Sequence, residues 1–314
     1  MRNWALSLFF WAALVAAQTY PAKPVHIIVA TGPGGADDFV ARQVAIKVGE
    51  ILGQQFIVEN RPGAGGMIGQ TYVAKSPPDG YTLLLAGGSM AGARYVNANM
   101  GYDLQRDFTP ISLVETSAFV LVANPAQPAK TTAQFIELGR SRPGKLTYGT
   151  LGAGQMPYWN VVLFNSMARI DAVEVQYKSI ADIVLDIIAG RLDYAFVPLG
   201  NALGNREKLR ALGVTTSTRA ELLPDVPALG EAALAGYDLP TFRSIMGPAG
   251  LSPQVVRTLN GAIERAIASP DLRERLSKAG STPMATSPEE LRKRFDQLAA
   301  IFGKVAAEIR LQPQ

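Results

Sequence analysis

Two glycine-rich stretches hold the residues best suited to bind an anion. The first, residues 31–35 (Thr-Gly-Pro-Gly-Gly), follows a continuous apolar run, and the second, residues 149–155, follows another apolar segment. Backbone N–H groups at the start of a helix have no partner inside the helix, and the helix dipole adds positive potential there, so such positions attract carboxylates and phosphates. We hypothesise that both stretches present N–H groups to an anion. A plain tight turn is the alternative for each.

Asp37 and Asp38 are the paired carboxylates next to the first stretch. General acid–base catalysis would require a raised pKa at one of them, whereas a position at a helix start lowers the pKa of a carboxyl group. We therefore interpret them as helix-capping residues and expect Arg42, one turn later, to pair with Asp38. Lys178 and Arg94 are the cationic candidates for a ligand anion, and a surface position is the alternative for both.

The chain lacks the residues that many catalytic mechanisms require. There is no Cys and a single His, so a Cys/His zinc site and a Cys nucleophile are excluded. That His26 lies within an apolar strand segment, where it is expected to be half-buried and unsuited to a Ser-His-Asp triad. A hydrolase would have to use a nucleophile such as Ser89 with Lys178 as its base. Residues 139–145 imitate a phosphate-binding loop, but Leu146 stands where Ser or Thr would hold magnesium. No catalytic residue, metal or cofactor is predicted.

An alternation of apolar strands and amphipathic helices must position these loops. A strand at 25–30 and a helix from Asp37 or Asp38 to Leu52 flank the first loop, and strand–helix–strand succession predicts parallel strands with right-handed crossovers. Residues 101–111 are expected to be irregular and residues 236–246 to be extended. Further strands are predicted at 55–59, 81–86, 119–123, 146–148, 173–175, 194–197 and 209–214, and helices at 67–75, 132–142, 156–167, 180–189, 252–268, 270–279 and 288–309.

The composition is that of a globular protein with a large core. The chain has 314 residues, of which 48% are hydrophobic and 18% charged, with a net charge of +4. Its Lys and Arg residues are scattered, so no nucleic-acid partner is expected. An apolar segment at residues 5–15, followed by the small residues of Val15-Ala-Ala17, predicts a signal peptide at residues 1–17 and export to the periplasm.

Short motifs follow one another along the chain in a recognisable order. They begin with Pro33-Gly-Gly-x-x-Asp38-x-x-Ala41-Arg42 and continue with Glu59 to Gly69, Val73-Ala-Lys, Pro78 to Leu83, Asp107-Phe-Thr-Pro110, Pro143 to Gly149, Gln176-Tyr-Lys178, Gly190-x-x-Asp193 and Leu223 to Pro227. Together they cover residues 21 to about 300, and in this order the chain resembles the substrate-binding proteins of tripartite tricarboxylate transporters, the Bug family.

The resemblance implies an α/β fold of the two-lobed periplasmic binding-protein type (type II, Venus-flytrap) with a mixed, mainly parallel sheet in each lobe. Residues 18–118 with 243–314 would form the first lobe and residues 119–242 the second. Such a protein is no enzyme. It would be a monomer that captures a small carboxylate between its lobes and hands it to membrane permease subunits. A ligand-sensing partner of a membrane sensor kinase is the alternative, and an exported hydrolase is a further one.

The resemblance also assigns a ligand pocket. Its residues would be Gly34, Gly35, Ser89, Ala91, Thr150, Gly152, Gly154, Tyr158, Val197, Pro198 and Phe242, with Gly35 at a positive φ where the backbone approaches the anion. Several of these positions depart from the family pattern: Tyr158 stands where relatives commonly have His, Val162 where they have Glu, and Phe242 where they have Trp. Since such walls are apolar or aromatic, we expect a carboxylate with an aromatic or aliphatic body rather than citrate or an amino acid.

Overall fold

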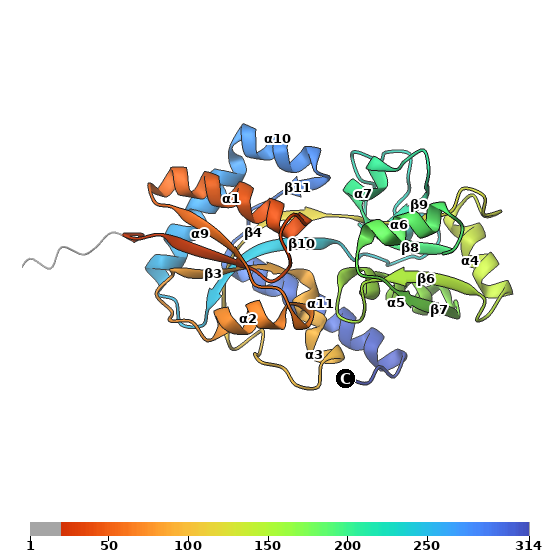
Figure 1. Ribbon diagram of the computed structural model, residues 1–314, viewed down its shortest axis with the longest axis horizontal. Helices are drawn as coiled ribbons and strands as arrows, with labels where there is room; N and C mark the ends of the chain where they lie inside the picture. Colours follow the sequence, from red (N-terminus) through yellow and green to blue (C-terminus); the bar gives the residue numbers. More distant parts are fainter. Residues whose placement is uncertain (1–19, 314) are drawn as a thin grey trace, which may run out of the picture.

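The computed structural model describes residues 20–313, so the signal peptide predicted at residues 1–17 lies outside the described residues. The chain forms two α/β lobes that lie side by side along the longest axis of the molecule (Figure 1), and each lobe is built on its own sheet. Within residues 20–313, no helix has the length and apolar character needed to cross a membrane. His26 is half-buried in its strand, as expected, and its Nδ1 lies 2.5 Å from Glu59 Oε1.

The first sheet has the strand order β11-β4-β10-β3-β1-β2. Its strands are β1 (Val25–Val29), β2 (Phe56–Asn60), β3 (Thr82–Gly87), β4 (Phe108–Ser117), β10 (Thr241–Pro248) and β11 (Ser281–Pro283). Alternate residues of β1 point to opposite faces, so Val25, Ile27 and Val29 pack under one helical layer and Ile28 under another. Helices α1 (Ala36–Leu52), α9 (Pro253–Ala268) and α10 (Pro270–Lys278) cover the first face; α2 (Met67–Ala74) and α11 (Pro288–Glu308) cover the second.

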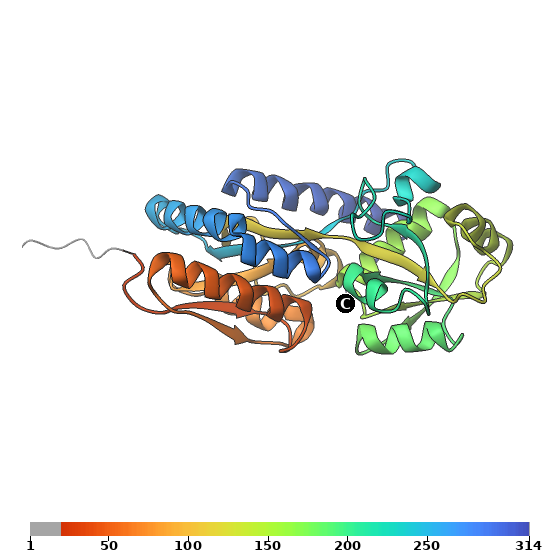
Figure 2. The same cartoon turned by 90° about the horizontal axis from the view of Figure 1, so that it is seen from above.

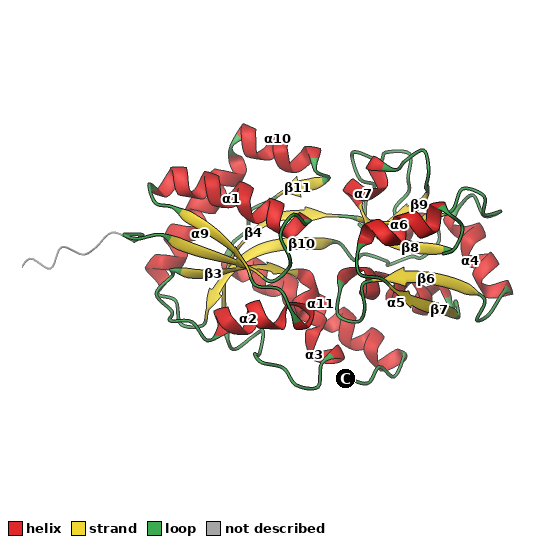
Figure 3. Ribbon diagram, viewed as in Figure 1, coloured by secondary structure: helices red, strands yellow, loops and turns green. Residues whose placement is uncertain are grey.

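The second sheet has the order β7-β6-β8-β5-β9. Its strands are β5 (Phe119–Ala123), β6 (Leu146–Thr150), β7 (Ala172–Gln176), β8 (Tyr194–Pro198) and β9 (Arg210–Val214). Helices α4 (Thr132–Ser141), α5 (Met156–Ala168) and α8 (Leu229–Ala232) pack on one face, and α6 (Ile180–Ile188) and α7 (Leu199–Gly204) pack on the other (Figure 3). Both sheets are mixed, and antiparallel pairs are at least as frequent as parallel ones, where the sequence favoured mainly parallel strands.

The chain passes between the two sheets at neighbouring places. Ala118 alone separates β4 from β5, and the return from the second sheet enters β10, which pairs with β4. The division of the lobes at 118/119 and at 242/243 stays a prediction that this connectivity supports. Helices α9 and α10 cover the first lobe as expected, whereas α11 also reaches the second lobe and packs on α5 (Figure 2).

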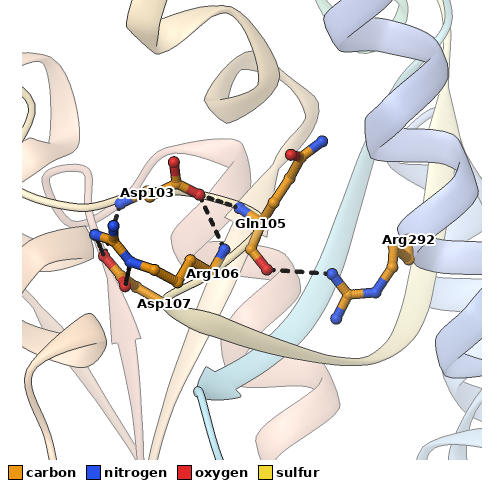
Figure 4. Close-up of polar contacts among 5 residues, drawn as sticks. All are labelled: Asp103, Gln105, Arg106, Asp107 and Arg292. Atoms are coloured by element: carbon orange, nitrogen blue, oxygen red, sulfur yellow. Dashed lines mark hydrogen bonds and ion pairs between the residues drawn. The ribbon is translucent and has the colours of Figure 1, made fainter.

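The expectation that residues 101–111 are irregular is wrong for the second half of that segment, because β4 begins at Phe108. A turn that is stabilised by side-chain hydrogen bonds precedes this strand (Figure 4). Asp103 Oδ1 accepts from the backbone N–H groups of Gln105 and Arg106 at 3.0 and 2.9 Å, and Arg292 of α11 donates to the Gln105 carbonyl at 3.3 Å. The polar turn and Pro110 concealed a strand whose apolar residues are buried and which pairs with β10 along its length, apart from irregularities at Ile111 and Val114.

Several short elements were not predicted from the sequence. They are η1 (Ala64–Gly66), η2 (Gly88–Gly92), α3 (Ala93–Val96), α7, α8 and β11. Each is too short to show a hydrophobic period of its own, and tertiary packing decides its conformation.

Trp159 of α5 joins the two lobes. Its ring is fully buried and stacks on Phe302 of α11 with ring centroids 4.4 Å apart and an interplanar angle of 21°. A Cβ atom on Gly92 of η2 would lie 2.5 Å from this ring, so the absence of a side chain there lets the first lobe approach it. The ring N–H is buried and has no hydrogen-bond partner among the described residues.

Replacement of Trp159 tests this joint. Trp159→Ala is expected to lower the free energy of unfolding by about 3–5 kcal/mol, because it leaves a cavity between α5 and α11. Trp159→Phe should cost clearly less, since it keeps an aromatic ring against Phe302 and removes an N–H group that has no partner. Urea unfolding followed by circular dichroism measures both. Equal losses for the two variants would show that ring packing is not what stabilises the joint.

Candidate functional site

A cleft of about 540 Å³ lies between the lobes and is the candidate site. The first lobe lines it with the Thr31–Val40 region and with Gly87, Gly88 and Ser89; the second lobe contributes Leu151, Gln155 to Pro157, Lys178 to Ile180 and Pro198 to Gly200; the connecting strands contribute Ser117, Thr241, Phe242 and Arg243. A second hollow, of about 700 Å³, lies along α2 and is lined by first-lobe residues only. We assign the site to the interlobe cleft because both glycine-rich loops reach it.

The first loop presents an open helix start to this cleft. Gly35 is the N-cap of α1, and no side chain caps the helix there. Its φ is −81°, so the expected positive φ at Gly35 is wrong; the left-handed residue is Gly34, at +82°. A Cβ atom on Gly35 would meet only the Gly32 carbonyl oxygen, at 3.9 Å. The N–H groups that begin α1 are therefore open toward the cleft, where the helix dipole favours an anion.

Asp38 fixes the loop from behind instead of capping the helix. Its Oδ2 accepts from the Gly34 N–H at 3.0 Å, and its carboxylate pairs with Arg42 at 2.8 Å, as the sequence predicted. The side chain is buried. The Arg42 guanidinium lowers the pKa of Asp38 to about 2, and the hydrogen bond from Gly34 acts in the same direction against the effect of burial.

The lowered pKa of Asp38 predicts a pH dependence of stability. Because the folded-state pKa lies below the ordinary value of 3.8, the carboxylate stabilises the fold fully above about pH 4, and this contribution is lost as the pH falls toward 2. It amounts to about 2 kcal/mol. Asp38→Asn should lose about that much at pH 7 and much less at pH 2, as measured by urea unfolding at both pH values. A loss that is the same at both pH values would rule out this ionisation as the cause.

The second loop offers fewer free donors than the first. Gly152 and Gly154 both have positive φ, and α5 begins after Gln155 without a side-chain cap. However, the Gly152 N–H already donates to Thr150 Oγ1 at 3.0 Å, and that hydroxyl donates to the carboxylate of Glu174. Pro157 in the first turn of α5 has no N–H at all. The Gln155 amide instead reaches across to the Gly65 carbonyl at 3.4 Å.

The structure gathers some of the expected pocket residues and not others. Gly35, Ser89, Pro198 and Phe242 line the cleft, and Gly34 lies in the same loop. Gly154 lines a smaller hollow of about 140 Å³ that shares Ser89 with the cleft. The remaining residues do not line the cleft: Ala91, Thr150, Tyr158 and Val197 are buried, and Gly152 is partly exposed outside it. Burial beside Glu174 raises the pKa of the Tyr158 hydroxyl to about 12.

The two cationic candidates have different positions. Lys178 lines the cleft and is exposed there, whereas Arg94 lies outside it, with its guanidinium carbon 5.1 Å from the ring centroid of Tyr95. Ser89 and Lys178 face the cleft from opposite lobes, and no hydrogen bond joins them, so the nucleophile–base pair of a hydrolase is not assembled.

Arg243 and its partner Glu115 were not predicted from the sequence, and Asp37, which was expected to cap a helix, pairs with Arg243 instead. Arg243 of β10 and Asp37 of α1 both line the cleft, with Arg243 Nε 2.6 Å from Asp37 Oδ1. Arg243 Nη1 lies 2.6 Å from Oε1 of Glu115, whose side chain is fully buried in β4. Burial opposes the positive charge, but Glu115 and Asp37 outweigh it, so the pKa of Arg243 is raised. The signal in the sequence that could have identified this pair is an Arg and a Glu, each inside an otherwise apolar strand segment.

The cleft walls combine apolar side chains with hydroxyl groups, the Gln155 amide and Lys178. Phe39, Phe119 and Phe242 contribute aromatic rings, and Leu151, Met156, Ile180 and Leu199 contribute aliphatic side chains. Tyr158, Val162 and Val197, from which the sequence drew an apolar pocket, are buried instead in the cores on either side of the second sheet. Within residues 20–313, no group of three or more His, Cys, Asp or Glu side chains is placed to hold a metal ion.

An interlobe cleft bounded by an open helix start and by two paired connecting strands defines a two-lobed solute-binding protein. Residues 40–311 match the family described as the tripartite tricarboxylate transporter family receptor. The chain belongs to this family, which consists of solute-binding receptors and not of enzymes, and the family resemblance of the sequence motifs is confirmed.

Relatives and solved structures agree with this assignment. The chain is 32% identical to protein BugT of Bordetella pertussis over 285 residues, 90% of this chain and 87% of that protein. An R. palustris protein with adipate has a TM-score of 0.84 at 29% identity, covering 94% of this chain and 100% of that one. Periplasmic binding protein BugD has a TM-score of 0.82 at 26% identity, covering 94% and 100%. MatC from Rhodopseudomonas palustris, with bound malate, has a TM-score of 0.80 at 28% identity, covering 91% and 99%.

Proposed function

We propose that this receptor works in the periplasm, where it captures a small carboxylate in the interlobe cleft and hands it to the membrane permease of a tripartite transporter. The observation that carries the proposal is the start of α1, which opens into the cleft without a side-chain cap. The similar structures with adipate and with bound malate support the proposal, because both of these ligands are dicarboxylates. Of the two glycine-rich loops, the first is the principal anion site, because in the second loop the Gly152 N–H already donates to the Thr150 hydroxyl.

The body of the ligand is aliphatic or aromatic. Phe39, Phe119 and Phe242 face the cleft with four aliphatic side chains, and burying apolar surface against them contributes about 25 cal/mol per Å². A hydroxyl, amino or third carboxylate group in the middle of the ligand would lack a partner where it faces these apolar side chains. Leaving such a group unpaired costs about 1–3 kcal/mol.

A ligand panel tests this proposal directly. Adipate and terephthalate should bind about tenfold or more tightly than citrate and glutamate, because the latter two carry polar groups that the apolar walls leave unpaired. Isothermal titration calorimetry on the mature protein gives the four dissociation constants. Tightest binding of citrate or glutamate would contradict the apolar pocket, while leaving the receptor family unchanged.

A substitution at Gly35 tests the loop. Gly35→Val should fold normally, since its φ and ψ lie in the extended region and its Cβ meets only one atom within 4 Å, at 3.9 Å. Its branched side chain would nevertheless project into the cleft, and adipate affinity should fall by about tenfold or more. Gly261→Val in α9 is the matched control, because Gly261 also has open space around its Cβ position and does not line the cleft. Unchanged adipate binding by a folded Gly35→Val protein would remove the first loop from the site.

A further inference from the structure

Arg243 lies where the cleft meets the strands that connect the lobes. Strand β10 places it opposite Gly87 of β3 on one side and opposite Glu115 of β4 on the other. Its side chain is 15% exposed, and the exposed part faces the cleft. Ser117 and Thr241, which are register partners on β4 and β10, line the cleft beside it. A charged, planar donor thus stands beside hydroxyl groups at the wall of the cleft.

Two carboxylates fix the guanidinium. Nε donates to Asp37 Oδ1 and Nη1 donates to Glu115 Oε1, each at 2.6 Å. Asp37 is held in turn through its Oδ2, which accepts from Thr31 Oγ1 at 3.3 Å. Because the plane of the guanidinium is fixed before a ligand arrives, a ligand that binds it does not have to immobilise a long, flexible side chain.

One end of the guanidinium remains open. Nη2 has two N–H groups, and neither hydrogen bond of Arg243 to the described residues uses it. Nη2 is also absent from the buried side-chain atoms that lack a partner, a set that does include Glu115 Oε2. Nη2 is therefore not fully buried, and within residues 20–313 it has no hydrogen-bond acceptor. The open start of α1 borders the same cleft and favours the same negative charge.

We propose that Arg243 is a specificity-determining residue that donates from Nη2 to a carboxylate of the ligand, with Asp37 and Glu115 as the positioning carboxylates that aim it. This inference rests on the proposed function. A guanidinium takes a planar carboxylate in preference to a neutral carbonyl or hydroxyl, so Arg243 selects carboxylates where the backbone N–H groups of the loop accept any anion.

Arg243→Gln tests the proposal with adipate and terephthalate as probes in calorimetric titration. Loss of one charge-assisted hydrogen bond should weaken binding of both by about 10- to 100-fold. Because Arg243→Gln alone leaves the buried Glu115 without its cation and can unfold the protein, the double variant Arg243→Gln/Glu115→Gln is measured as well, and it should show the same loss. Lys47→Gln is the control: it removes one positive charge from α1, outside the cleft, and should change affinity by less than about threefold.

Asp37→Asn tests whether Asp37 acts through Arg243. Because Asp37 holds the guanidinium in place, Asp37→Asn should weaken adipate binding by about threefold or more. This loss should disappear when Asp37→Asn is combined with Arg243→Gln/Glu115→Gln, since no guanidinium is then left to position. A loss of the same size in both backgrounds would show that Asp37 only holds the loop and would overturn its positioning role.

The outcomes distinguish this proposal from the one on which it rests. A folded double variant that binds adipate and terephthalate like the natural protein overturns the role of Arg243 and leaves the receptor function intact. A loss by Lys47→Gln as large as that by Arg243→Gln also overturns it, because the effect would then be one of overall charge. If the natural protein binds neither probe, both the carboxylate ligand and the role of Arg243 are wrong.

Discussion

The structure depends on the pairing of β4 with β10. Both connections between the lobes leave from these two strands, and their register sets Arg243 against Glu115. Glu115 is fully buried, so its charge must be matched inside the protein. A broken buried ion pair typically costs about 3–5 kcal/mol, because the remaining charge is left without a partner. If one strand shifted past the other by one residue, its side chains would turn to the opposite face of the sheet. The cleft walls would then be disrupted, and the buried charge of Glu115 would lose its partner.

The same pair connects the fold to the site. Asp37 stands in the first turn of α1 and Arg243 in the strand that returns from the second lobe, and they lie 206 positions apart in the chain. The ion pair between Asp37 and Arg243 thus connects the start of α1, which attracts an anion, to the connecting strands. Behind it, Asp38 and Arg42 hold the loop to α1. The two adjacent carboxylates have different partners and therefore different roles: Asp37 faces the cleft, and Asp38 supports the loop.

The sequence predicted the elements that have a clear period and missed those that tertiary contacts create. The βα units around residues 31–35 and 149–155, the Asp38–Arg42 pair and the three C-terminal helices follow from local patterns. The start of β4 and the short β11 depend on pairing partners far along the chain. In the site, Gly35, Ser89, Pro198 and Phe242 were expected at the cleft and line it. Arg243 was missed because its partners, Asp37 and Glu115, are brought to it only by the return of β10.

The place of β10 in the first sheet has a consequence for the order in which the chain assembles. This strand lies between β3 and β4, so residues 25–117 contain the strands on both sides of it but neither β10 itself nor the edge strand β11. All strands of the second sheet, in contrast, lie within residues 119–214. During synthesis the second lobe can therefore complete its sheet first, while the first lobe must wait for residues 241–248 to leave the ribosome. The lobe that contains β1 is therefore the second of the two to complete its sheet.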